Sequence, residues 1–415
     1  MIIALVSPRR DGRALLAMLT LAGIACVAGA SGCSSRRQVR PPTIQAATSS
    51  ERDVLEADIL FYRERAARDP SGAADLAHLS ALYLERARQS GDQRDAVLAE
   101  QAARHSLANR STHNAAARQV LASALLAQHR FDEALVVAKR VRDSEPSSPA
   151  LRAMVAEIEM ELGAYDSAKV GFASLDSAKH SLAVAPRLAR WAEIRGHTEA
   201  ARRYMRDALA TAQRTPGMPR EQVAWFWLRA GDIELRDEKF AAADSAYQAG
   251  LRANPNDYRV LAGLARLAAA RGNWRAAAHF GEASIASNLD PATLGIVSDA
   301  YAALGDTAKA AEFARALDVA VSHQPGAYHR AWSLFLLDHD RRVSLVSRNI
   351  RKEMKSRRDI YAYDLLAWSL HKQGRDIEAL SAIHMALGQG TKDPLLARHA
   401  AAIEAAVSNT TEAAR

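Results

Sequence analysis

The sequence predicts an all-α protein folded as a solenoid of about nine helix-turn-helix repeats, and three observations support this prediction. A marker residue, often aromatic, recurs at intervals of about 34 residues, and alanine follows each marker three positions later. Glycine stands two positions before five of the seven markers. Apolar residues make up 49% of the chain but aromatic residues only 6%, a balance typical of helices packed through small side chains. The markers are Phe131, Tyr165, Thr198, Phe240, Trp274, Thr307 and Asp376, and the alanines are Ala134, Ala168, Ala201, Ala243, Ala277, Ala310 and Ala379.

The stretch from Trp227 to Pro255 shows the pattern most clearly. Trp227 and Gly231 lie four residues apart and therefore share one face of a first helix. Ala243 and Tyr247 lie on one stripe of a second helix, which Pro255 ends because proline cannot continue a helix. We expect Gly231 and Ala243 to let the two backbones approach closely. A single hairpin has no core of its own, so it must stack on its neighbours.

This combination of period, aromatic residue, alanine and proline resembles the tetratricopeptide repeat (TPR) family over roughly residues 72–405. Seven copies in phase make the resemblance specific. It implies a right-handed α-solenoid whose concave groove binds a protein or peptide. The eighth repeat is degenerate, because Asp338–Arg342 replaces the usual glycine turn. The segment 338–390 also resembles the C-terminal half of uncharacterised bacterial TPR proteins, which supports the fold and implies no chemistry.

The predicted organisation begins with a signal peptide at 1–33 that has a lipobox-like end, followed by a disordered spacer at 34–50. The solenoid is predicted over 51–408, and a polar tail over 409–415. Within the solenoid we expect a capping helix at 51–70, repeats at 73–110, 115–147, 149–178, 182–214, 224–256, 258–290, 291–321, 326–357 and 360–391, and a C-terminal helix at 394–407.

The N-terminus predicts export and a membrane tether. Three arginines precede the apolar run 14–30, which is the order of a secretory signal. The small residues before Cys33 resemble a bacterial lipobox, which implies lipidation of Cys33, although Ala30 stands where that family usually has leucine. An uncleaved anchor helix is the alternative, and Met18 is an alternative start. Ser34 after the cysteine favours the outer membrane of a bacterial cell envelope, by resemblance to lipoprotein sorting.

Composition and motifs argue against catalysis and nucleic-acid binding. The net charge is +8, but lysine and arginine alternate with acidic residues and no basic run contains aromatics. Thirteen histidines form no His-Glu-x-x-His pair, and neither a Gly-x-Ser-x-Gly elbow nor a phosphate-binding loop occurs. Both cysteines lie in the N-terminal segment, so neither a disulfide nor a cysteine metal site is expected in the repeats. We therefore expect no enzyme activity, cofactor or metal.

The remaining candidate site is the concave groove, which the first helix of each TPR pair lines. Arginine beside aromatic residues is typical of binding hot spots, and Trp225 and Trp368 are the aromatic candidates. Packing of both tryptophans as ordinary core is the alternative. We expect a membrane-tethered scaffold that holds a protein or peptide in this groove during cell-envelope assembly or secretion. A structural or self-associating spacer whose groove is occluded is the alternative function. The groove candidates are Arg190, Trp225, Asp232, Arg236, Arg259, Arg266, Asp299, Tyr361, Trp368, His371 and Lys372.

Overall fold

The computed structural model describes residues 44–322 and 330–413. The predicted signal peptide, Cys33 and the start of the predicted repeat at 326–357 lie outside these residues. In the described part the chain forms twenty α-helices and one 3-10 turn, and no strand. The helices are α1 (Ile44–Arg68), α2 (Ala73–Ser90), α3 (Gln93–Asn109), α4 (Ala115–Ala127), α5 (Phe131–Ser144), α6 (Pro149–Glu161), α7 (Tyr165–Ala173), α8 (Ala185–Ile194), α9 (Thr198–Arg214), α10 (Arg220–Arg236), α11 (Phe240–Ala253), α12 (Tyr258–Ala270), α13 (Trp274–Ile285), α14 (Pro291–Ala303), α15 (Thr307–Ser322), α16 (Arg330–Asp338), α17 (Val343–Glu353), α18 (Ile360–His371), α19 (Asp376–Leu387) and α20 (Pro394–Ala413), and the 3-10 turn is η1 (Asp176–Ala178).

Consecutive helices pack as pairs, and each pair stacks on the next. The marker residues begin the second helices of the pairs, and the alanines three positions later lie where two helices cross. Six of the seven predicted alanines are fully buried, with 0% of their surface exposed. Ala310 is half-buried, and α15 instead buries Ala314 and Leu317, four and seven residues further on. The all-α repeat fold predicted from the sequence is confirmed.

The packing of Tyr247 explains the glycines in the central repeat. This tyrosine is fully buried between α10 and α12, and its hydroxyl donates to Asp232 Oδ1 at 2.9 Å. A Cβ atom on Gly231 would lie 2.5 Å from the tyrosine ring, and one on Gly263 would lie 2.8 Å from it. Both helices therefore need glycine at these positions, because the ring fills the space of the missing side chains.

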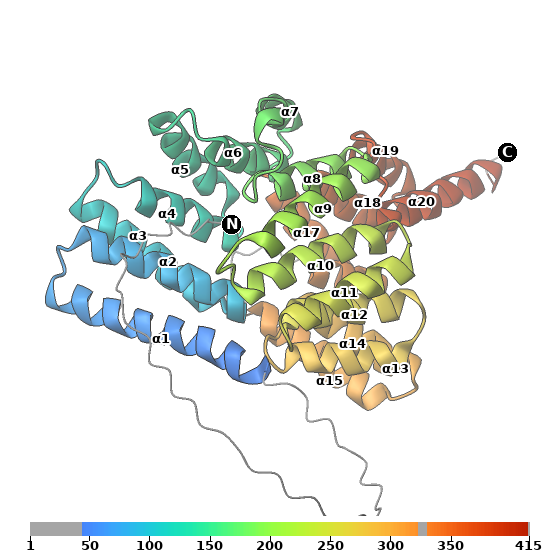
Figure 1. Ribbon diagram of the computed structural model, residues 1–415. Coiled ribbons are helices and arrows are strands. Elements are labelled where there is room, and N and C mark those ends of the chain that lie inside the picture. Colours follow the sequence, from blue (N-terminus) through green and yellow to red (C-terminus); the bar gives the residue numbers. More distant parts are fainter. Residues whose placement is uncertain (1–43, 323–329, 414–415) are drawn as a thin grey trace, which may run out of the picture.

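The solenoid coils so tightly that its second turn rests on its first. Hydrogen bonds join residues about 195 positions apart: Arg357 Nε donates to the Glu161 carbonyl at 3.0 Å, and the Ile360 amide donates to Tyr165 Oη at 2.8 Å. Further along, Arg195 Nη1 donates to Gln389 Oε1 at 2.6 Å. In Figure 1 the orange and red helices α17 and α18 lie behind the green helices α8–α10.

This contact between turns has its own apolar core. Buried residues of α6–α8, including Met160 and Leu188, pack with buried residues of α18–α20, including Ile383 and Ile403. The two groups are about two hundred residues apart in sequence. The C-terminal helices are therefore held by the middle of the chain as well as by their immediate neighbours.

The ends and the eighth repeat differ from the predicted pattern. α1 begins at Ile44, inside the predicted spacer 34–50, since the segment 44–50 contains neither proline nor glycine to stop a helix. α20 continues to Ala413, beyond the predicted end at residue 407, and projects away from the body in Figure 1. In the turn of the eighth repeat, which has no glycine, Asp340 and Arg342 take positive φ angles of 51° and 50°. His129 and Glu238, two positions before α5 and α11, likewise take positive φ angles of 57° and 56° without glycine.

Candidate functional site

The first helices of the pairs line the inside of the coil, and a cleft opens where the two turns face each other. This cleft, here called the inter-turn cleft, has a volume of about 490 Å³. One wall comes from α2, α3 and α4, and the other from α10, α12 and the turn between α13 and α14. It is lined by Leu84, Ala87, Arg88, Gly91, Asp92, Gln93, Ala96, Ala127, Leu228, Arg229, Asp232, Tyr258, Arg259, Ala262, Arg266, Asn288 and Asp290.

A network of charges centred on Asp232 holds the far wall of the inter-turn cleft. Arg266 Nη2 lies 2.8 Å from Asp232 Oδ1, and Arg229 Nη1 lies 2.9 Å from Asp232 Oδ2. Burial acts to raise the pKa of Asp232, but the guanidinium groups of Arg266 and Arg229 outweigh it and lower this pKa to about 2. The carboxylate is therefore ionised at any physiological pH, and it fixes two arginines at the edge of the cleft.

Arg259 and Arg88 complete the cationic lining. Arg259 lies 2.6 Å from a Glu221 carboxylate oxygen and 2.7 Å from one of Asp257. Arg88, on the opposite wall, makes no ion pair within residues 44–322 and 330–413. Burial raises the pKa of Glu85, three residues earlier on α2, and the charge of Arg88 opposes this rise. Since no carboxylate of the described residues forms a close ion pair with Arg88, its guanidinium can also meet a carboxylate of another molecule.

The structure places three other predicted residues in the contact between turns. Arg190 Nη1 donates to Tyr361 Oη at 3.1 Å, and Arg236 pairs with Glu193. Arg330 also lies over the Tyr361 ring, 4.7 Å from its centre. The space around Arg190, Arg236 and Tyr361 is only about 30 Å³, room for about one water molecule. These three side chains close the coil in this structure.

Trp368, His371 and Lys372 form a separate cluster at the C-terminal end of α18. The Trp368 ring stacks on His399 at 4.2 Å and on His371 at 4.9 Å, and its Nε1 donates to Asp338 Oδ1 at 2.8 Å. Lys372 Nζ lies 5.3 Å from the centre of the Trp368 ring. This tryptophan is half-buried and belongs to the edge of an apolar core.

The last two candidates lie apart from these groups. Trp225 packs at the edges of two apolar cores, 5.1 Å from the Phe226 ring centre. Asp299 Oδ1 lies 2.8 Å from His339 Nε2. The structure therefore brings Asp232, Arg259 and Arg266 together at the inter-turn cleft and distributes the other predicted residues among closed contacts and other surfaces.

A second cleft, of about 580 Å³, lies between the start of α5 and helices α16 and α17. Phe131, Trp332 and Ile350 supply its apolar surface. Burial raises the pKa of Glu353 in this cleft to about 7, although Arg357 Nη1 lies only 3.1 Å from it and favours its charged form. Glu353 therefore changes charge close to neutral pH.

Sequence reasoning missed Arg88, Arg229 and the whole second cleft. Arg88 and Asp232 lie on distant segments of the chain, and no local pattern indicates that these segments meet at one cleft. Arg229 had a weak signal, because it precedes Asp232 by three residues on one helix and i,i+3 pairs face each other. In the described residues, no group of three or more His, Cys, Asp or Glu side chains is arranged to hold a metal.

Comparison with protein families matches the tetratricopeptide repeat family over residues 92–158 and 125–185, which include α3 to α7. Residues 92–185 therefore have the sequence of tetratricopeptide repeats. The matching family is a repeat family and not a catalytic one. The TPR match covers α3 and α4 in one wall of the inter-turn cleft but not α2, and the stacked helix pairs continue the same arrangement to α20. No curated protein matches the chain.

Solved TPR-like structures resemble the chain only distantly. PilW, described as a widely conserved type IV pilus biogenesis factor, is 19% identical with a TM-score of 0.42, and the alignment covers 54% of this chain and 99% of PilW. PilF of Pseudomonas aeruginosa is 17% identical with a TM-score of 0.39, over 54% and 97% of the two chains. The human IFIT1 dimer with PPP-AAAA is 13% identical with a TM-score of 0.44, over 76% and 90%. Such low values imply nothing about the partners of this chain.

Proposed function

We propose that this TPR protein is a non-catalytic scaffold that holds a segment of a partner protein in the inter-turn cleft. The observation that supports this proposal most is the composition of the cleft, a space of about 490 Å³. Arg88 lies on one wall and Arg229, Arg259 and Arg266 on the other, with Asp92, Asp232 and Asp290 also in the lining. Apolar side chains such as Leu84 and Leu228 lie between the charges. An extended segment with a carboxylate beside small apolar residues complements this lining.

The test is to place a photocrosslinking amino acid at Gln93, which lines the cleft, and to irradiate living cells. We expect a discrete adduct with a partner protein. The change Arg88→Glu should weaken binding by about 1–2 kcal/mol, roughly five- to thirtyfold, because it reverses the charge that meets the partner's carboxylate. The adduct should fade accordingly.

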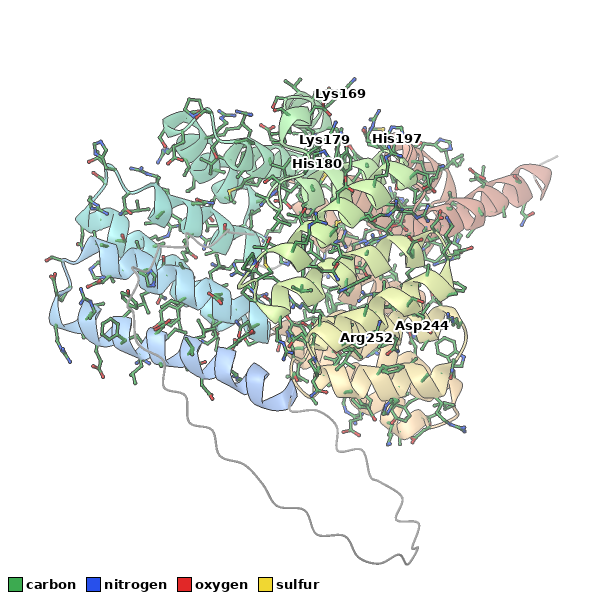
Figure 2. The ribbon with its side chains drawn as sticks, in the orientation of Figure 1. Lys169, Lys179, His180, His197, Asp244 and Arg252 are labelled. Carbon is green, nitrogen blue, oxygen red and sulfur yellow. The ribbon has the colours of Figure 1, made fainter. Side chains whose placement is uncertain are left out.

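Arg252→Glu is the matched control. Arg252 is exposed on α11, labelled in Figure 2, and lies outside the cleft lining. The same change of charge there should leave the Gln93 adduct unchanged. An adduct that persists in Arg88→Glu, or that fades equally in both variants, would contradict a partner site in this cleft.

A structural spacer with an occluded groove is the second candidate function, and the contact between turns favours it. Arg190, Arg236 and Tyr361 fill the inside of the coil with the chain's own side chains. If the whole groove is closed, no partner adduct forms at Gln93. A protein that acts only as a spacer should also keep its function in Arg88→Glu, because that function depends on the length of the solenoid and not on the cleft. Irradiation of the Gln93 variant therefore separates the two candidates.

We also propose that the scaffold is exported and anchored in a bacterial cell envelope through lipid on Cys33, with the outer membrane favoured. The sequence pattern around Cys33 supports this proposal. Among the described residues, none of the helices is both long and apolar enough to cross a bilayer. Metabolic labelling with an alkyne fatty acid should mark the wild type and not Cys33→Ala. Equal labelling of both proteins would exclude Cys33 as the site.

A further inference from the structure

An apolar stripe is exposed on α1, the helix that caps the N-terminal end of the solenoid. Val54, Leu60 and Phe61 are 58%, 56% and 52% exposed, and Ala57 lies between them on the same side of the helix. Most other exposed large apolar residues of the described chain are isolated. Large apolar side chains gathered on one helix face commonly mark a contact with another protein.

The opposite side of α1 packs against the solenoid. Leu55 and Ile59 are buried against α2, where they pack with Leu79 and Tyr83. Phe61 is partly covered by the Arg65 guanidinium, 5.6 Å from the ring centre, yet half of its surface stays exposed. Internal packing therefore accounts for one face of α1 and leaves the exposed apolar stripe without an explanation.

Charges along α1 are sorted by sign. Four acidic residues and one arginine lie in the segment 51–58, whereas three arginines and one glutamate lie in the segment 63–68. The two segments thus have net charges of −3 and +2. Acidic residues near a helix N-terminus and basic ones near its C-terminus also suit the helix dipole, but the dipole does not explain an exposed apolar stripe.

We propose that two copies of this chain associate through their α1 helices, which lie antiparallel across a twofold axis between Leu60 and Phe61. Only the antiparallel arrangement places each acidic segment beside the basic segment of the other copy, and a parallel pair would place like charges together. An axis at this point also sets Asp53 of each copy opposite Arg68 of the other, because the two residues are equally far from it in sequence. The interface is self-complementary, as a twofold dimer requires.

Some charges of α1 are already committed within one copy. Glu56 lies 2.8 Å from Arg86, and Arg65 lies 2.9 Å from Asp75, so both are paired with residues of α2. These two pairs hold α1 on the solenoid and leave its outer face to other residues.

Asp53 and Arg68 are the charges that the other copy can satisfy. Asp53 is exposed and makes no ion pair within the described residues. Arg68 pairs with Glu64 one helical turn earlier, at 3.2 Å, but its side chain is 78% exposed. An exposed pair of this kind contributes little, so Arg68 can turn to Asp53 of the other copy at small cost. A helix of 25 residues is about 37 Å long, so the interface is small and the dimer is expected to be weak and concentration-dependent.

The dimer goes beyond the proposed function, and its failure would leave the inter-turn cleft untouched. The experiment is disulfide crosslinking of the full chain in intact membranes with Leu60→Cys, a position next to the proposed axis. Mild oxidation should yield a covalent dimer, because thiols near a twofold axis approach within disulfide distance. The unmodified chain, with its native cysteines, gives the background. Val170→Cys, a 73% exposed position on α7, should give no dimer above this background.

Charge exchange tests the antiparallel arrangement. Asp53→Arg alone and Arg68→Asp alone should each reduce the Leu60→Cys dimer about tenfold, since each places like charges together. The double variant Asp53→Arg, Arg68→Asp should restore the dimer, because opposite charges again face each other across the axis. Circular dichroism of each variant should show unchanged helix content.

Four outcomes would overturn the proposal. Three of them are no dimer above background with Leu60→Cys, no restoration in the double exchange, and a crosslink from Leu60→Cys to a protein of different mass. Protection of the Leu60→Cys thiol without dimer formation would place another segment on α1 and would also overturn it.

Discussion

Arg190 and Tyr361 join two turns of the solenoid. The arginine donates a hydrogen bond of 3.1 Å to the tyrosine hydroxyl, and its guanidinium carbon lies 5.1 Å from the centre of the ring. The residues are 171 positions apart in sequence. Because this contact joins the fourth repeat to the ninth, successive turns of the solenoid pack directly on each other here.

Graded changes at Tyr361 should separate its two contributions. Tyr361→Phe removes the hydrogen bond from Arg190 and the longer one that the hydroxyl donates to Asp393 Oδ2, and it keeps the ring, so we expect a loss of about 0.5–1.5 kcal/mol in the free energy of unfolding. Tyr361→Leu also removes the cation–π contacts with Arg190 and Arg330, with a further loss of about 0.5–2 kcal/mol. Urea denaturation followed by circular dichroism measures both. Equal stability of the two variants would show that the ring contacts contribute nothing.

Alanine substitution at two glycines that share the same φ angle tests the contact between turns, because the cost in backbone strain is the same at both positions. Gly196 and Gly374 both have φ of +70°, so alanine at either position costs roughly 1–2 kcal/mol of strain. A Cβ atom on Gly196 would lie 2.1 Å from the Gly390 carbonyl oxygen, whereas one on Gly374 would meet nothing within 4 Å. Gly196→Ala should therefore destabilise by about 1–3 kcal/mol more than Gly374→Ala in urea denaturation. Equal losses would mean that the turns do not touch at Gly196.

Packing of Tyr247 between two helices predicts coupling between the tyrosine and its glycines. Gly231→Ala should destabilise by about 1–3 kcal/mol, because the new methyl group overlaps the ring, even though alanine favours helices. In the background of Tyr247→Leu the same change should cost much less, since the smaller side chain leaves room. A double-mutant cycle in urea gives the coupling energy. Additive effects would contradict the contact.

Stability should depend on pH through Glu353. Its pKa of about 7 in the folded protein lies above the ordinary value of 4.5, so the folded state holds the proton more tightly than the unfolded chain. The resulting stabilisation is complete below pH 4.5 and is lost as the pH rises through 7. The glutamine of Glu353→Gln stays neutral at every pH. As the pH rises from 5 to 8, the free energy of unfolding of this variant should therefore increase relative to that of the wild type.

Thermal unfolding at several pH values measures this difference. Glu312→Gln, at an exposed position of α15, is the matched control and should follow the wild type throughout. A stability difference between Glu353→Gln and the wild type that stays constant with pH would show that Glu353 does not titrate near neutrality.

The repeats were predictable because each is a local pattern. Ala168, Ala201 and Ala243 are fully buried where the period places them, and the proline at 149 starts its helix as expected from its fixed φ. The groove residues were predictable only in part. Asp232, Arg259 and Arg266 lie together because they occupy consecutive first helices. Arg190 and Tyr361 were chosen for a groove, but the structure joins them to each other.

The sequence alone determined that this chain is a stack of helix pairs, because small residues recurring in phase specify how each helix meets its neighbour. Tertiary structure alone decided that the second turn of the stack rests on the first, and hence which charges face a cleft and which close a contact. The physical reason is that each repeat is rotated by a small angle relative to the one before it, and these rotations add up along the stack. Only their sum over about six repeats decides whether Gly163 contacts Arg358 or solvent.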